Sequence, residues 1–275
     1  MKSLHKGLVA AAVMIGGLLS ASIVSAQDLP APPAPGVSKR VDDIRASGVL
    51  RVGVLNNEPW LVQDTLGGDQ PWSGPAWLLA ETYAKLLGVK VQEVPVSGET
   101  KVTLLAANQA DISITALGVS PEREKVVDFI VYSNNSTCMI GRADNAKFAA
   151  ATTIEDLNTP DFDLVYGIGA PDDTYLKNRF PNAKVRGVTT AIDEVLAGHA
   201  DSTPYNRIQA VRLMKKVSGL KSLPEDCQHS TEQSSDVGMA IDKNQPEFLD
   251  WLRAVATAMK SEVVAEEDRA TAALD

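Results

Sequence analysis

An arginine follows closely on a short apolar segment that ends in glycine. In the stretch DISITALGVSPEREKVVDF, residues 111–129, apolar and polar residues first alternate, as in a half-buried strand, and Gly118 then breaks the pattern. Arg123 follows, and its guanidinium group is a planar, permanently charged donor that fits a carboxylate. A glycine at position 118 would let a ligand approach the backbone closely. Two interpretations stay open: Arg123 binds an anionic ligand, or it is a surface residue paired with Glu122 or Glu124.

Other signatures of catalysis or metal binding are sparse. The chain has 3 histidines, and the pair Cys227 and His229 is a weak metal signal without a second pair of ligands. The sequence patterns of serine hydrolases, zinc proteases and phosphate-binding loops do not occur. We therefore expect no metal, no cofactor and no enzymatic activity.

The N-terminus has the layout of a secretory signal peptide. Lys2 and Lys6 form a basic start, an apolar stretch follows, and small residues end at Ala26, so we expect residues 1–26 to be cleaved. Residues 27–40 are rich in proline and should form an extended linker. The formal net charge is −9 with the two lysines and more negative without them, which argues against nucleic acid as a partner. We expect an exported, periplasmic protein.

The chain contains two cysteines, Cys138 and Cys227. In an oxidising compartment an even pair of cysteines favours a disulfide. The alternative is a pair of buried free thiols.

Strand-like and helix-like patterns alternate along the rest of the chain. From residue 49 to residue 115 the order is strand, helix, strand, helix, strand, and a second block from 162 to 216 repeats the alternation. This alternation predicts an α/β fold with largely parallel strands. Two further strands, 137–142 and 236–241, are expected to cross between the blocks. The predicted organisation is two lobes, the first made of residues 41–138 and 237–275, and the second of residues 139–236.

Several stretches together resemble one family. They are SGVLRVGV at 47–54, LLAETYAKLLGVKVQEV at 78–94, LLAANQADISITALGVSPEREKVVDF at 104–129, EVLAGHADS at 194–202 and VGMAIDKNQPEFLDWLRAVATAMKSE at 237–262. Their order and spacing resemble the extracytoplasmic solute-binding proteins of ABC importers, of the polar amino-acid type (family 3). The resemblance implies a two-lobed type II periplasmic-binding-protein fold with hinge strands.

The resemblance also implies roles for individual residues. Arg123 would bind the α-carboxylate of an amino-acid-like solute with help from the Gly118 amide, and Thr115 would offer its hydroxyl near the amino group. Ligands bind at the carboxyl ends of strands in such open sheets. Further ligand contacts are expected from Asn57, Trp60, Glu99, Asp172, Asp173 and Asn206.

This chain departs from the family pattern at several of these positions. Glu99 stands where a ligand-stacking aromatic is usual, and Pro171 in the turn GAPDD lacks a hydroxyl and a backbone donor. Acidic groups at 99, 172 and 173 would favour a ligand that carries extra cationic groups. The alternative for Asp172 and Asp173 is that they only stabilise a helix start. Trp60 is the better candidate for stacking on a ligand than the helical Trp77.

The expected function follows from the resemblance. We expect a monomeric binding protein that closes around a small polar, amino-acid-like solute and delivers it to an ABC permease in the membrane. One alternative is an exported enzyme similar to the cyclohexadienyl dehydratases, which eliminate water and carbon dioxide from prephenate-like acids, with Asp173 as general acid. Another is a solute sensor for a membrane receptor.

Overall fold

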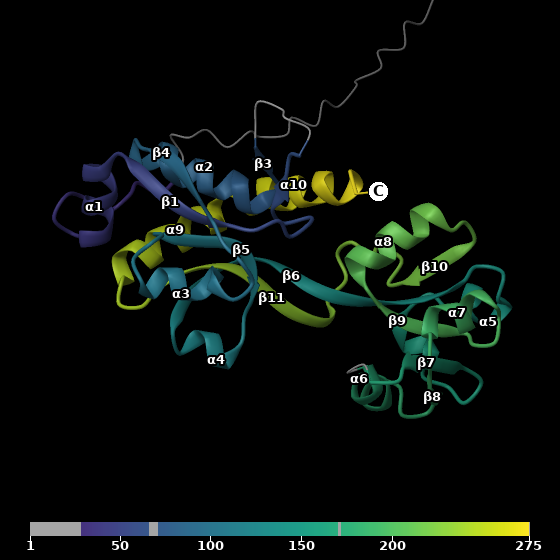
Figure 1. Cartoon of the computed structure of the whole chain (residues 1–275). Coiled ribbons are helices and arrows are strands. Elements are labelled where there is room, and N and C mark those ends of the chain that lie inside the picture. The colour runs from purple at the N-terminus through teal and green to yellow at the C-terminus, as the bar shows by residue number, and fades with distance from the viewer. Residues whose placement is uncertain (1–28, 66–70, 170–171, 275) are drawn as a thin grey trace, which may run out of the picture.

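A computed structural model describes residues 29–65, 71–169 and 172–274 (Figure 1). The predicted signal peptide and the first residues of the linker lie outside the described residues. Among residues 29–38, the carbonyl oxygen of Pro30 accepts a 2.9 Å hydrogen bond from the Trp251 indole. Helix α1 begins at Lys39, so the last two residues of the segment predicted as linker are helical. None of the described helices combines the length and apolar character that a membrane crossing needs.

The strands form one large mixed sheet and a small two-stranded sheet of β2 and β3. The order in the large sheet is β4-β1-β5-β11-β6-β9-β7-β8, and β10 also pairs with β6. The strands are β1 Val49–Val54, β2 Val62–Gln63, β3 Trp72–Ser73, β4 Lys90–Pro95, β5 Ile112–Gly118, β6 Val127–Arg142, β7 Asp163–Gly167, β8 Lys184–Val188, β9 Ser202–Asn206, β10 Leu220–Leu223 and β11 Glu232–Asp242.

Helices cover the sheet on both of its faces. They are α1 Lys39–Ser47, α2 Pro75–Leu87, α3 Thr100–Ala106, α4 Pro121–Glu124, α5 Ala146–Ala150, α6 Asp172–Arg179, α7 Ala191–Leu196, α8 Arg207–Lys216, α9 Pro246–Ala258, α10 Lys260–Ala272 and the 3₁₀ helix η1 Ile154–Leu157.

Two separate hydrophobic cores define two lobes. The core of the first lobe packs α1, α2 and α9 on one face of β1 and β5, around the fully buried Tyr83 and Phe248. The core of the second lobe packs α5, η1 and α6 around Phe148 and Phe180. The predicted two-lobed α/β fold is confirmed. Its residue boundaries stay predictions, because β6 and β11 pass from one core to the other without a break (Figure 1).

The two long strands β6 and β11 run through both lobes, and we call them the linking strands. They make the sheet mixed. Within each lobe the pairs β1–β4, β1–β5, β7–β8 and β7–β9 are parallel, as predicted. β11 pairs with both β5 and β6 in the antiparallel sense, and β6 pairs with β9 in the same way. The predicted crossing strand 137–142 is the end of one 16-residue strand, β6, and helix α10 was not predicted.

In each lobe an aspartate forms the same pair of hydrogen bonds with a residue of the neighbouring parallel strand. In the first lobe the Asp111 N–H donates to the Arg51 carbonyl, and the Arg51 N–H donates to the Asp111 carboxylate, both at 2.9 Å. In the second lobe Asp201 and Asp163 exchange the same two bonds at 2.9 and 2.8 Å. Each aspartate thus fixes the start of one central strand against its parallel neighbour.

The predicted disulfide between Cys138 and Cys227 is confirmed. It joins β6 to the segment between β10 and β11, and both cysteines are buried beside Ile140 and Ala210. The bond therefore anchors the segment that leads into β11 to strand β6 in the second lobe.

Candidate functional site

Arg123 lies beside Gly118 at the carboxyl end of β5. Ser120 caps the short helix α4 by accepting the N–H of Arg123 at 3.4 Å. The Arg123 guanidinium donates from Nη1 to the Gly118 carbonyl at 2.6 Å. Within the described ranges Arg123 forms no ion pair, so the surface pairing with Glu122 or Glu124 does not occur here. The remaining guanidinium donors are available for an anion.

A second cation lies near Arg123. The pKa of Lys101, in the first turn of α3, is lowered because the side chain is partly buried and because Arg123 is close. The described part of the chain gives Lys101 no carboxylate partner either. Two neighbouring cations without a counter-ion favour an anionic ligand. Lys101 was not among the predicted site residues, although a lysine in the first turn of a helix, where the macrodipole disfavours cations, is a signal visible in the sequence.

Asn57 stabilises the backbone of β5 just before Gly118. Its Nδ2 donates to the carbonyl oxygens of Thr115 and Ala116, both at 3.3 Å. Ala116 has a φ of +53°, in the left-handed region that non-glycine residues rarely adopt. Asn57 therefore stabilises a bend in β5 ahead of Gly118, which is a positioning role.

The Thr115 hydroxyl does not point to solvent. Thr115 is fully buried, and its Oγ1 lies 3.3 Å from Oγ of Ser113 on the same face of β5. In this structure the hydroxyl is therefore not accessible to a ligand at the end of β5.

Trp60 lies at the junction of the lobes. It is buried among Ala116, Ile208, Val237 and Leu274, and its indole N–H donates to Ser133 Oγ at 2.8 Å. The ring has no broad exposed face in this arrangement of the lobes, since only 8% of the residue is exposed.

In the second lobe the two adjacent aspartates have different environments. Asp173 forms an ion pair with Lys177 at 2.6 Å, and the Lys177 hydrogen bond lowers the pKa of Asp173. Asp172 is half-buried, and burial raises the pKa of its carboxyl group. Within the described ranges Asp172 has no cationic partner. Pro171 lies outside the described residues.

The two remaining predicted residues, Glu99 and Asn206, both lie at the start of a helix. Glu99 is exposed and precedes α3 without capping it. Asn206 caps α8, where its Oδ1 accepts the N–H groups of Ile208 and Gln209 at 3.0 and 3.3 Å. Its Nδ2 donates to Oδ1 of Asn135 at 2.6 Å, so the Asn206 side chain connects the start of α8 to strand β6.

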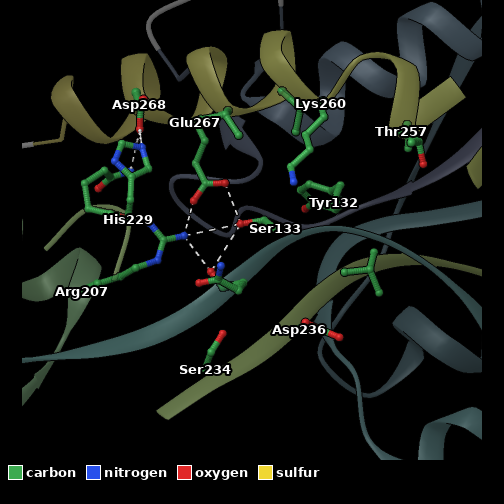
Figure 2. Close-up of a pocket in the computed structure, with 16 residues that line it drawn as sticks. Tyr132, Ser133, Arg207, His229, Ser234, Asp236, Thr257, Lys260, Glu267 and Asp268 are labelled. Atoms are coloured by element: carbon green, nitrogen blue, oxygen red, sulfur yellow. Dashed lines mark hydrogen bonds and ion pairs between the residues drawn. The ribbon is translucent and has the colours of Figure 1, made fainter. Parts of the chain in front are cut away.

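A cluster that the sequence did not reveal joins the lobes on the α10 side of β6. Arg207 of α8 donates to Asn134 O at 2.7 Å and forms an ion pair with Glu267 of α10. Ser133 donates to the other Glu267 oxygen at 2.6 Å. These residues lie along a cavity of about 490 Å³ (Figure 2). No set of three or more His, Cys, Asp and Glu side chains in residues 29–65, 71–169 and 172–274 is arranged to hold a metal ion.

Comparisons with characterised proteins correct one expectation. The cyclohexadienyl dehydratase of Pseudomonas aeruginosa is 24% identical over 203 residues, which cover 72% of this chain and 71% of the dehydratase. A membrane-bound lytic murein transglycosylase F of Vibrio cholerae is 34% identical over 113 residues, which cover 41% of this chain and only 19% of the transglycosylase. The chain thus spans about a fifth of that relative. Since relatives of this chain include enzymes, the expectation that it is not an enzyme is wrong as stated.

Solved structures and a family model agree on the fold. An ancestral cationic amino acid solute-binding protein superposes with a TM-score of 0.57 at 28% identity, covering 84% of this chain and 97% of the other. An ancestral cyclohexadienyl dehydratase superposes with a TM-score of 0.66 at 27% identity, covering 85% and 95%. The family model described as bacterial extracellular solute-binding proteins, family 3, matches residues 50–267. The predicted resemblance is therefore confirmed, and this chain belongs to the bacterial extracellular solute-binding proteins of family 3.

Proposed function

We propose that this chain is an exported binding protein that captures a small amino-acid-like solute between its lobes. One observation carries the proposal: Arg123 and Lys101 are neighbouring cations without a carboxylate partner among the described residues, beside the carboxyl end of β5. A solute carboxylate would pair with them. Gly118 lies directly beside the guanidinium, since a Cβ there would be in ordinary van der Waals contact with Arg123 Nη1 at 3.6 Å.

The other end of the solute would carry positive charge. Asp172 offers a carboxylate without a cationic partner, at the start of α6 in the second lobe. Closure by rotation about β6 and β11 would bring it toward Arg123. An ancestral relative at 28% identity is named for cationic amino acids, which supports lysine or arginine as the first solutes to examine.

Calorimetry with L-lysine, L-arginine and a panel of other amino acids tests this proposal. At least one cationic amino acid should bind, and Arg123→Ala should weaken it by about 2–5 kcal/mol, because the solute carboxylate loses its charged partner. Lys125→Ala is the matched control, since Lys125 is an exposed cation of the same segment. An affinity that is equal in both variants would remove Arg123 from the site.

Delivery to a membrane permease is the second part of the proposal. It rests on the family and on the expected signal peptide. Cells that lack this chain should lose high-affinity uptake of the solute identified by calorimetry. Normal uptake, with loss of a solute-induced response, would instead favour the role of a sensor.

An enzymatic function is a second candidate, and Asp172 favours it. A half-buried carboxyl group with a raised pKa and no cation is a better general acid than Asp173, which is paired with Lys177. The dehydratase relatives make prephenate the substrate to test. Formation of phenylpyruvate that is lost in Asp172→Asn but retained in Asp173→Asn would establish this function, and no turnover at high protein concentration would reject it.

A further inference from the structure

The cavity on the α10 side of the linking strands has walls from both lobes. β6 and β11 form its floor, α9 and α10 supply the side of the first lobe, and Arg207, Gln228 and His229 supply the side of the second lobe. Figure 2 shows Lys260, Glu267 and Asp268 on one side, with Ser234 and Asp236 opposite them. Its volume of about 490 Å³ is in the range of small-molecule sites, roughly 300–1,000 Å³.

Several residues that line this cavity carry buried polar atoms without a hydrogen-bond partner. Apart from Asp173 Oδ1, which is ion-paired with Lys177, six buried side-chain nitrogen or oxygen atoms of the described residues have no hydrogen-bond partner, and four of the six belong to lining residues. They are Tyr132 Oη, Asn134 Oδ1, Arg207 Nε and Gln228 Oε1. Arg207 is almost completely buried, with 3% of its side chain exposed. A buried polar atom left unpaired costs about 1–3 kcal/mol, so a polar occupant would favour small rotations that bring these atoms to the cavity surface.

Two charged side chains of the lining also have no partner. Arg207, Glu267, His229 and Asp268 pair with one another or with neighbours. In contrast, Lys260 and Asp236 form no side-chain hydrogen bond or ion pair with any described residue. In Figure 2 Lys260 extends toward Tyr132, and Asp236 lies on the β11 side.

From these groups we propose that the cavity is a second small-molecule site, for a small zwitterion. Its carboxylate would accept a hydrogen bond from Lys260, and its ammonium group would donate to Asp236, both of which are exposed. Tyr132, Asn134 and Gln228, whose unpaired atoms lie beneath the cavity surface, would rotate to pair with the same molecule. An anion alone would leave the acceptors unpaired, and a cation alone would leave the donors unpaired. The site is distinct from the proposed solute site, because neither Arg123 nor Lys101 lines it.

The test uses Arg123→Ala protein, which weakens the proposed solute site. Two-dimensional amide NMR spectra follow titration with glycine and β-alanine, and with acetate and methylammonium as single-charge probes. The zwitterions should give saturable shifts at the Trp60 indole N–H, which donates to Ser133 in the lining, and the single-charge probes should not.

Variants then locate the binding site. Adding Lys260→Ala or Asp236→Asn should weaken this binding at least about tenfold, because each removes one charge-assisted bond. Lys184→Ala and Asp250→Asn are matched controls on exposed residues outside the cavity and should change nothing. The proposal is overturned if no zwitterion gives a saturable shift at Trp60, if acetate or methylammonium gives the same shift, or if binding survives both cavity variants. None of these outcomes bears on Arg123, which calorimetry on the otherwise unaltered chain tests separately.

Discussion

Arg207 and Glu267 form a buried ion pair that connects α8 of the second lobe to α10 of the first. Their side chains are only 3% and 8% exposed. Glu267 also accepts from Ser133, which in turn accepts from the Trp60 indole. Since an ionised group out of water costs several kcal/mol unless it is paired, each member of the pair depends on the other.

Removing Glu267 should therefore destabilise the protein strongly. Glu267→Ala leaves Arg207 buried and unpaired, and the free energy of unfolding should fall by about 3–5 kcal/mol in urea denaturation. The double variant Arg207→Met, Glu267→Leu should recover much of the loss, because it removes both charges. The exposed pair of Lys39 and Asp43 provides the control, and Asp43→Ala should have little effect. A loss for Glu267→Ala no larger than that of the control would contradict this account.

His229 should make the contact between the lobes depend on pH. Its ring contacts Asp226 at 2.8 Å and Asp268 of α10 at 3.1 Å. The hydrogen bond to Asp226 and the nearby charge of Asp268 raise the pKa of His229 above 6.5. A pKa that is raised in the folded state adds stability that is fully present below the unfolded value and is lost as pH rises through the folded value.

The measurement compares wild-type protein with His229→Gln. The difference in free energy of unfolding should be larger at about pH 5.5 than at about pH 9, and the ring-proton NMR titration of His229 should have its midpoint above the ordinary histidine value. His199→Gln, which removes an exposed histidine of the second lobe, is the control for the effect of the substitution itself. A difference that does not change with pH would show that the ring is not charged in the contact.

Local patterns were sufficient for most of the fold. The strand β1 was predicted as observed, because its largely apolar segment VLRVGV follows Gly48, which ends α1 in the left-handed conformation. Of β6 only the end, residues 137–142, was predicted as a crossing strand, because the polar stretch SNNST at 133–137 separates it from the apolar residues that begin the strand. Those residues belong to a linking strand between two cores, where no single apolar face is required.

The site was less predictable, because its contacts join distant segments. Arg123 and Gly118 are close in the chain, so their contact followed from the sequence, whereas the nearness of Lys101 to Arg123 depends on how α3 packs. Glu267 looked like one more acidic residue of a polar helix, and only packing against the second lobe buries it. The i,i+4 spacing of Asp173 and Lys177 is visible in the sequence. It could have predicted that Asp173, and not Asp172, is paired with a lysine.

The disulfide should add substantially to stability. Cys138 and Cys227 are 89 residues apart in the chain, so the bond strongly restricts the unfolded state. Replacing both cysteines by serine should lower the free energy of unfolding by about 2–5 kcal/mol, and dithiothreitol should have a similar effect on the wild type only. Two reactive thiols in the unfolded, unreduced protein would contradict the bond.

Asp201 should stabilise the second lobe only when it is ionised. Burial opposes its ionisation, but hydrogen bonds from Lys147, the Asp163 N–H and Asn145 together outweigh burial and hold the pKa below the ordinary aspartate value. A pKa that is lowered in the folded state adds stability that is present above the unfolded value and is lost as pH falls through the folded value.

Asp201→Asn tests this directly. At pH 7 the variant should lose about 1.5–3 kcal/mol of unfolding free energy, because hydrogen bonds to a charged acceptor are replaced by bonds to a neutral one. The loss should shrink toward about pH 3, where the wild-type carboxylate begins to protonate in the unfolded chain. Asp161→Asn, at an exposed turn before β7, should be neutral at both pH values. An equal loss for Asp201→Asn at both pH values would mean that the shape of the side chain, and not its charge, holds the start of β9 against β7.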